Sequence, residues 1–147
     1  MALSYRKGMI MLPKKQATVN VSQVDLLAAM EREPKLTNFG LGIFDDPRLT
    51  EAGRAAEFEK NRRALAENFD EFTTCVRWLT GRVRHVCSDS YALKHAVEHD
   101  LPGVYVSNGS FIAAVIHMGI PYVKYRDYPN IHIQWRKWAR MQRERQL

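Results

Sequence analysis

The sequence predicts a mainly helical α+β protein. Apolar residues recur at steps of three and four through residues 50–80, which is the spacing of one helix face. Two short runs typical of strands flank a turn-forming segment at residues 127–130, and Gly and Pro separate shorter helical segments before them. We expect three parts: an N-terminal arm, short helix and loop over residues 1–49, a core domain over residues 50–135 and a basic tail over residues 136–147.

The first twenty residues lack a clear period, so we expect an extended arm. Ser22 and Asp25 form a capping-box pattern just before apolar residues, which predicts a helix over about residues 22–32. Pro34 ends this helix, because proline cannot continue it. The glycines and the proline within residues 35–49 predict a loop.

The strongest pattern is an apolar stripe that follows Thr50, a good N-cap residue. Its steps are 3, 4, 3, 4, 3, 4 and 3, and Arg62 is its single charged member. The stripe consists of Ala55, Phe58, Arg62, Leu65, Phe69, Phe72, Val76 and Leu79. Gly81 ends the helix, and a break near Asn68 would divide it into two. The phenylalanine and leucine members of the stripe could also form a homodimer interface.

Shorter elements follow the stripe. Residues 82–87 alternate polar and apolar side chains and predict a short strand. Helices are expected over about residues 90–100 and 109–118, each preceded by N-cap side chains and followed by Gly or Pro. Residues 122–126 and 131–135 predict a β-hairpin, because Asp, Pro and Asn lie between them. The tail beyond the hairpin is expected to be helical or frayed.

From residue 50 onward, this order of elements matches a winged-helix domain, in which a β-hairpin wing follows a helix-turn-helix. In such domains the third helix enters the DNA major groove and the wing contacts the phosphate backbone. The corresponding helix here, about residues 109–118, contains no Arg or Lys and is apolar on nearly all sides, which is typical of a buried helix. Phosphate contact through the wing and the tail is therefore favoured over reading of base edges.

The charge of the chain favours an anionic partner. There are 22 Lys and Arg against 16 Asp and Glu, a formal net charge of +6, and the last fifteen residues contain five basic residues and one acid. Nucleic acid, with DNA as the first candidate, is the expected partner, held by cationic and aromatic side chains. The candidate binding residues are Lys124, Arg126, Arg136, Lys137, Arg140 and Trp138, with Arg82 and Arg84 added if the short strand lies beside the wing.

Two segments carry a resemblance to a known group of proteins. They are residues 90–98, with the sequence SYALKHAVE, and residues 105–114, with the sequence YVSNGSFIAA. The pattern resembles one found in small uncharacterised proteins of bacterial mobile elements and phages, over roughly residues 70–130. The resemblance implies a mobile-element origin and no particular activity. It leads to an alternative function, an inhibitor or adaptor (for example of a host defence complex) that docks on an acidic protein surface through the same basic residues.

Catalysis and metal binding are weakly indicated. The chain has no glycine-rich phosphate loop and no recognisable nucleophile motif, so the sequence predicts a non-enzymatic protein without a cofactor. A zinc site remains an alternative, although no C-x-x-C pair is present and exposed or hydrogen-bonded histidines are favoured. Its possible ligands lie within fifteen residues of one another and are His85, Cys87, His95 and His99.

Membrane insertion is not expected. The longest nearly uncharged stretch, residues 105–122, contains Asn, Gly, His and Pro and is too short and too broken to span a bilayer. The two cysteines do not form a disulfide-dense framework, as in proteins of reducing compartments. We therefore expect a cytoplasmic protein.

Overall fold

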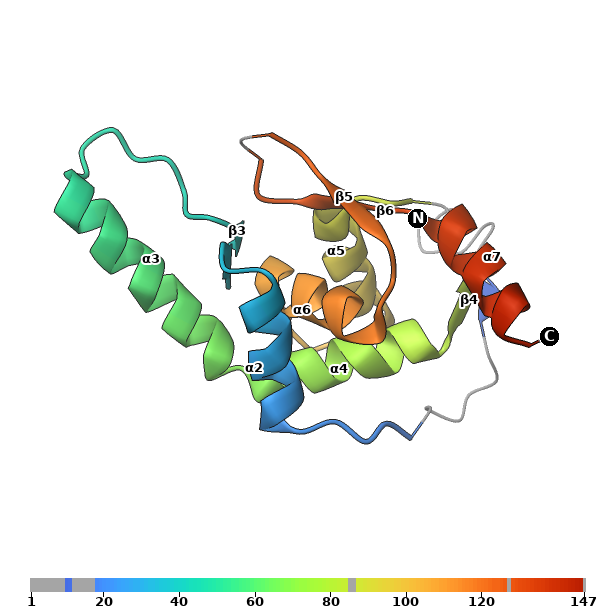
Figure 1. The fold of residues 1–147 in the computed structure, drawn as a ribbon. Helices are drawn as coiled ribbons and strands as arrows, with labels where there is room; N and C mark the ends of the chain where they lie inside the picture. The colour runs from blue at the N-terminus through green and yellow to red at the C-terminus, as the bar shows by residue number, and fades with distance from the viewer. Residues whose placement is uncertain (1–9, 12–17, 85–86, 127, 147) are drawn as a thin grey trace.

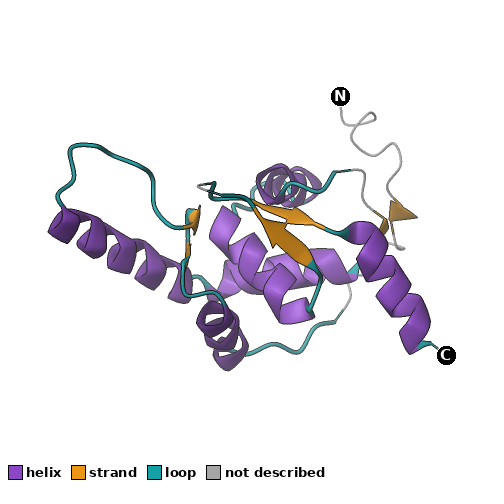
Figure 2. Ribbon diagram, turned by 45° about the horizontal axis from the view of Figure 1, so that its top comes forward, coloured by secondary structure: helices purple, strands orange, loops and turns teal. Residues whose placement is uncertain are grey.

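Helix α6, Asn108–Met118, lies at the centre of the molecule with the other helices arranged around it (Figure 1). The computed structural model describes residues 10–11, 18–84, 87–126 and 128–146 of the chain. Within them the protein is an α+β structure made mainly of helices, as the sequence predicts, and the strands form short antiparallel pairs (Figure 2). No helix in this part of the chain is both long enough and apolar enough to cross a membrane.

The apolar sequence of α6 explains its central position. Ser107 Oγ accepts a hydrogen bond from the Ser110 amide at 3.0 Å and caps the N-terminus of the helix. Gly119 ends it with φ at 73°, a left-handed conformation that glycine adopts without steric strain. Every residue from 108 to 116 is buried, which confirms the expectation of a buried helix. The side chains of α6 are therefore not available to enter a groove of DNA.

Helix α2, Gln23–Arg32, packs on α6 and matches the predicted helix closely. The Ser22 amide donates to Asp25 Oδ2 at 2.8 Å, which is the reciprocal contact of the expected capping box. The core side of α2 consists of Leu26, Ala29 and Met30. A segment assigned to the N-terminal part thus contributes to the hydrophobic core, while the expected boundaries at residues 49 and 135 stay predictions.

The prediction of a loop over residues 35–49 is wrong in its first part. Strands β2, Leu36–Thr37, and β3, Gly40–Leu41, form a small antiparallel hairpin. The start of α6 lies directly against it, because a Cβ atom on Gly109 would overlap the carbonyl oxygen of Thr37. Two-residue strands carry too little periodicity to be recognised in a sequence.

The long apolar stripe is divided at Asn68, as one of the two sequence interpretations allows. Helix α3 spans Glu51–Ala66 and helix α4 spans Phe69–Thr80. In α4 three stripe residues, Phe72, Val76 and Leu79, are buried, and this helix packs on α6. Phe69 is only partly buried, and in α3 only Leu65 is buried. Most of α3 therefore extends away from the core, at the left of Figure 1. Because Leu65 and Phe72 are fully buried within the chain, they are not available for a homodimer interface.

Arg62, the charged member of the stripe, has a structural role. Its guanidinium donates hydrogen bonds to the carbonyl oxygens of Met30 and Leu36, both at 2.8 Å, and of Pro34 at 3.2 Å. These carbonyls belong to the last turn of α2 and the segment that follows it, where the helix leaves acceptors without donors. A basic side chain at a helix C-terminus also interacts favourably with the helix dipole.

The C-terminal elements follow the predicted order. Helix α5, Ser90–Asp100, is capped by Asp89 Oδ1, which accepts from the amides of the next turn. Strands β5, Tyr122–Lys124, and β6, Ile131–Ile133, form the expected hairpin, with both isoleucines buried and His132 exposed. The tail forms helix α7, Trp135–Arg145.

One strand pairing was not expected. Strand β4, Arg82–Arg84, pairs with β1, Ile10–Met11, which lies in the segment expected to be an extended arm. Within the described residues β4 does not join the β5–β6 sheet. Arg82 and Arg84 were expected to add to the binding surface if their strand lay beside the β5–β6 hairpin. The strand pairing does not place β4 there.

Candidate functional site

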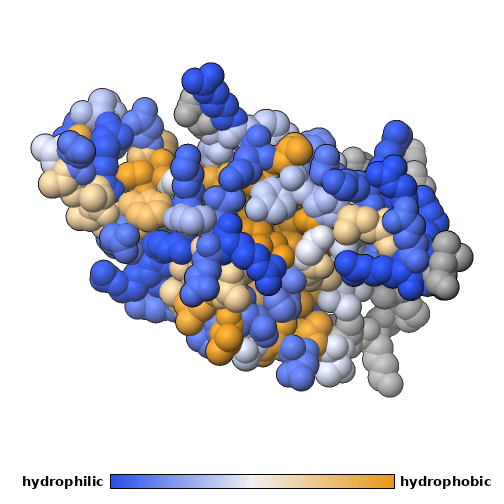
Figure 3. Space-filling view, viewed as in Figure 1, coloured by the Kyte–Doolittle hydropathy of each residue, from blue (hydrophilic) through white to orange (hydrophobic). Residues whose placement is uncertain are grey.

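Helix α7 presents most of the predicted binding residues. Trp135, Trp138 and Met141 are half-buried, and Trp135 Nε1 donates to the carbonyl oxygen of Cys87 at 2.8 Å, which holds the helix on the body. The exposed basic residues of α7 are Arg136, Lys137, Arg140, Arg143 and Arg145. The space-filling view shows hydrophilic side chains gathered at the α7 end of the molecule (Figure 3).

Three arginines of α7 lie on one face. Arg136, Arg140 and Arg143 follow one another at four and three residues, so their side chains share one face of the helix. We call these three residues the basic face. Among the described residues none of them forms an ion pair, so no carboxylate of this part of the chain pairs with their charges. Trp138 instead packs beneath Arg145, whose guanidinium carbon is 5.8 Å from the indole centroid.

The β5–β6 hairpin contributes less unpaired positive charge than its sequence suggests. Lys124 Nζ forms an ion pair with Glu33 Oε2 at 3.1 Å, and this carboxylate is buried. Tyr122 Oη lies 3.5 Å from the same oxygen, and burial together with the negative charge of Glu33 raises the pKa of Tyr122. Arg126 is exposed in the loop that follows β5. The structure thus brings Arg136, Lys137, Arg140 and Trp138 together on α7, while it pairs Lys124 with Glu33.

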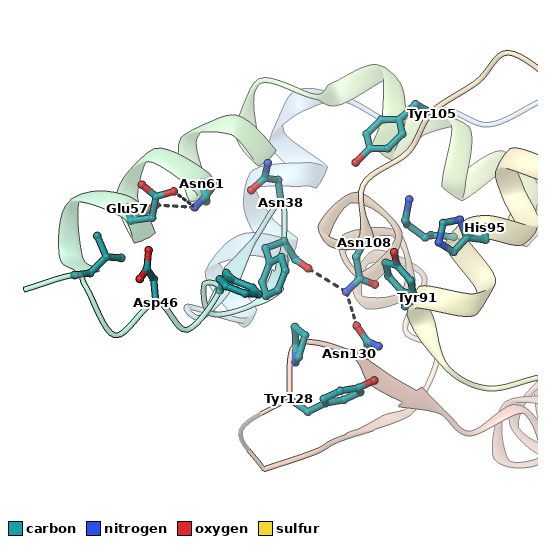
Figure 4. A pocket seen from close by; sticks show the side chains of 15 residues that line it. Asn38, Asp46, Glu57, Asn61, Tyr91, His95, Tyr105, Asn108, Tyr128 and Asn130 are labelled. Carbon is teal, nitrogen blue, oxygen red and sulfur yellow. Dashed lines mark hydrogen bonds between the residues drawn. The ribbon is translucent and has the colours of Figure 1, made fainter. Parts of the chain in front are cut away.

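A second feature is a cleft of about 940 Å³ between the α3 arm and the body (Figure 4). It is bounded by the segment from Asn38 to Leu49, by α3, by α5 and by the hairpin loop around Tyr128. Five exposed aromatic side chains line it, and we call it the aromatic cleft. They are Phe39, Phe44, Tyr91, Tyr105 and Tyr128. Large exposed aromatic groups gathered in one concavity are typical of binding sites.

A chain of hydrogen bonds fixes the orientation of one amide in this cleft. Asn130 Nδ2 lies 3.4 Å from both carboxylate oxygens of Asp89, which can only accept. Asn130 Oδ1 therefore accepts from Asn108 Nδ2 at 2.8 Å. The second hydrogen of the Asn108 amide goes to the carbonyl oxygen of Phe39 at 3.1 Å. Asn108 Oδ1 is left as a buried acceptor with no hydrogen-bond partner.

A buried cation lies in the wall of the same cleft. The ammonium group of Lys94 is bound by Glu98 at 3.2 Å and by the carbonyl oxygen of Val106 at 3.2 Å. The rings of Tyr105 and Tyr91 cover it, with centroids at 4.7 and 5.5 Å. Burial opposes ionisation of Glu98, but hydrogen bonds from Lys94 and the Val106 amide outweigh it and lower the pKa of Glu98. The charge of Lys94 is thus compensated within the chain.

The histidine and cysteine residues do not form a metal site within the described part of the chain. No group of three or more His, Cys, Asp or Glu side chains there could hold an ion. His95 Nδ1 contacts Glu98 Oε1 at 2.9 Å, and His99 Nδ1 lies 3.8 Å from Asp100. Burial, helped by the charge of Asp89, raises the pKa of the Cys87 thiol, which makes it a poor nucleophile and ligand. His85, the other candidate ligand, lies outside the described residues.

The aromatic cleft was not predicted from the sequence, although two segments singled out there contribute to it. The two segments that carry the resemblance, 90–98 and 105–114, contribute five lining residues. These are Tyr91, Lys94, His95, Tyr105 and Asn108. The polar and aromatic residues of the pattern, as opposed to its aliphatic residues, therefore line the cleft.

Comparisons with known proteins add no relative: no family model matches the chain, and neither the curated proteins nor the solved structures contain a significant match.

Proposed function

We propose that the protein is a non-enzymatic nucleic-acid-binding protein that contacts phosphates through α7. The observation that carries the proposal is the basic face, Arg136, Arg140 and Arg143, on an exposed helix whose opposite side is held to the body by Trp135. Guanidinium groups form strong paired hydrogen bonds with phosphate oxygens. Exposed Lys137 adds a fourth positive charge on the same helix.

The dimensions of the basic face suit a phosphate backbone. Arg143 follows Arg136 by seven positions, which is about 10 Å along the helix axis. Duplex DNA carries one charge per about 1.7 Å of its axis, so several phosphates lie within reach of the three side chains. Such contacts position a protein on nucleic acid without reading its sequence.

The winged-helix prediction enters this proposal in a restricted form. The order of helices and hairpin is present, but α6 is buried and Lys124 is paired with Glu33. We therefore propose that α7 takes the main contact and that Arg126 on the hairpin loop adds a secondary one. Phosphate contacts of this kind give little preference for base sequence. Duplex DNA is the first ligand to test.

The test compares two triple variants of equal net charge. One replaces the basic face (Arg136→Ala, Arg140→Ala, Arg143→Ala), and the other replaces exposed basic residues of α3 and α4 (Lys60→Ala, Arg63→Ala, Arg77→Ala). Binding to labelled random duplex, single strand and RNA is followed by fluorescence anisotropy from about 50 to about 200 mM salt. We expect the basic-face variant to bind at least about tenfold more weakly, with a salt slope reduced by about 3, and the control to change little.

Two outcomes would contradict the proposal. Equal losses in the two variants would mean that net charge, and not the basic face, determines binding. No salt-dependent binding by the unmodified protein would remove nucleic acid as the partner. In that second case an acidic protein surface, the alternative partner for the same arginines, is tested by capture from nuclease-treated host extract with the same two variants.

A further inference from the structure

We infer that the aromatic cleft binds a guanidinium group, as an arginine side chain of a polypeptide presents it. This site lies apart from the basic face, and the inference does not rest on the proposed nucleic-acid binding. It follows from the hydrogen-bonding capacity of the lining, from its residual charge and from its aromatic surface.

The polar lining is rich in acceptors that lack donors. Asn108 is only 4% exposed, and its Oδ1 has no partner because both of its amide hydrogens are used. Asn38 Oδ1, in the same cleft, is also buried without a partner. Leaving a buried acceptor unsatisfied is unfavourable, so a native protein that retains two in one cleft is expected to pair them with a ligand. The complementary ligand is a donor.

The residual charge of the cleft favours a cation. Lys94 is already compensated by Glu98, and Asp46 is taken by Arg48 through contacts of 3.0 Å. Glu57 is half-buried in the opposite wall, and among the described residues its carboxylate accepts a hydrogen bond from the neutral amide of Asn61 at 3.2 Å and forms no ion pair. A carboxylate without a basic partner attracts a cation and repels phosphate. An anionic nucleotide is therefore disfavoured here.

Among possible cations, the aromatic rings favour a planar one. Tyr105 is 65% exposed and Tyr91 49% exposed, and Figure 4 shows the Tyr91 ring beside Asn108 and the Tyr105 ring farther away along the same cleft. Cations bind over aromatic faces, and guanidinium combines this with stacking. It also has five N–H donors in one plane and no acceptor, which matches a lining that offers unpaired oxygens. An ammonium group is compact and strongly hydrated and fits this combination less well.

Binding requires a small movement of the lining. The unpaired oxygens are covered by neighbouring atoms, so a donor reaches them only when a side chain in front of them shifts. The tyrosine side chains of the lining are exposed and can move without disturbing the core. We therefore expect ligand binding to change the environment of Asn108 as well as that of the tyrosines.

The experiment uses the full chain and four probes. Three are acetylated and amidated Gly-Arg-Gly, Gly-Lys-Gly and Gly-citrulline-Gly, and the fourth is agmatine, a small free guanidinium. Titrations are followed by the ¹H–¹⁵N resonances of the protein, including the Asn108 side-chain amide. The arginine peptide should bind about tenfold more tightly than the citrulline peptide, which is planar but neutral, and more tightly than the lysine peptide. If the guanidinium group alone is sufficient for binding, agmatine should bind as well as the arginine peptide. If the cleft also recognises the peptide backbone, the arginine peptide should bind and agmatine should not.

Matched variants locate the site. Glu57→Gln and Tyr105→Ala should each weaken arginine binding about fivefold, whereas Glu59→Gln and Val104→Ala, outside the lining, should not. Equal binding of arginine and citrulline peptides, an unshifted Asn108 amide, or equal effects of the Glu57 and Glu59 variants would overturn the inference. Because none of these changes touches α7, the result is separate from the test of nucleic-acid binding.

Discussion

Lys124 Nζ lies 3.1 Å from the buried carboxylate of Glu33, and this ion pair joins the β5–β6 hairpin to the C-terminal end of α2. This ion pair gives Lys124 a structural role within the chain. The same contact explains why a hairpin with a basic sequence does not present all of that charge to solvent. It also leads to a prediction that separates the hairpin from α7.

Lys124→Ala should reduce nucleic-acid affinity by less than about twofold, whereas Arg140→Ala should reduce it about threefold to tenfold. Lys124→Ala should also lower the free energy of unfolding by about 1 kcal/mol, because it leaves Glu33 buried without its cation, while the pair itself is partly solvated. Anisotropy and urea unfolding measure the two effects. A larger loss of affinity for Lys124→Ala than for Arg140→Ala would return the main contact to the hairpin.

Arg62→Ala should lower the free energy of unfolding by about 2–3 kcal/mol, because it leaves carbonyl oxygens at the end of α2 without their donor. The exposed neighbour Arg63 provides the control, and Arg63→Ala should change stability by no more than about 0.5 kcal/mol. Urea unfolding of both variants measures the difference. If the two variants were equally stable, the capping role of Arg62 would be wrong.

Gly109→Ala should destabilise the protein by about 3 kcal/mol or prevent folding, because the added methyl group would overlap the backbone at Thr37 and Asn38. Gly81→Ala is the matched control, since its Cβ would meet only ordinary contacts at 3.7 Å and its φ is −80°. That variant should be neutral or slightly stabilising. Thermal unfolding compares the two, and similar melting temperatures would contradict the close approach of α6 to β2.

Glu98→Gln should remove about 3 kcal/mol of stability at neutral pH, because Lys94 would stay buried without its carboxylate. The pKa of Glu98 is lower in the folded chain than in the unfolded chain. Its contribution is therefore fully present above the unfolded value, about 4.3, and is lost as the pH falls through the folded value. The stability difference between the two proteins should shrink below about pH 4, and a difference that persists there would contradict the assignment.

Local sequence patterns were sufficient for the helices and the β5–β6 hairpin. Ser22 with Asp25, Gly119 after α6 and the turn residues before β6 act within a few neighbours, so their effects are visible in the sequence. The β1–β4 pairing joins residues more than seventy positions apart, and no local rule selects such a partner for a two-residue strand. The role of Arg62 was missed because its acceptors lie at the end of α2 and in the segment that follows it, far from Arg62 along the chain.

The basic face and the aromatic cleft differ in how far they could be predicted. Arg136 and Arg140 lie on one helix, so a correct helix prediction places them together. The cleft is assembled from segments that begin at Asn38 and end at Asn130, and its unpaired oxygen exists only because Asp89 orients Asn130. Such a site depends on tertiary packing, which the sequence alone did not reveal.

The two walls of the aromatic cleft are anchored unequally. On one side α6 fixes Asn108 deep within the core, whereas α3 is held mainly near its C-terminal end by Leu65 and the contacts of Arg62. With few buried apolar side chains, the outer half of α3 costs little free energy to displace. A displacement of this half about the inner end of the helix would alter the width of the entrance and leave the position of Asn108 unchanged. With Asn108 fixed and the entrance variable, the inferred arginine ligand could be presented by polypeptide backbones of different bulk.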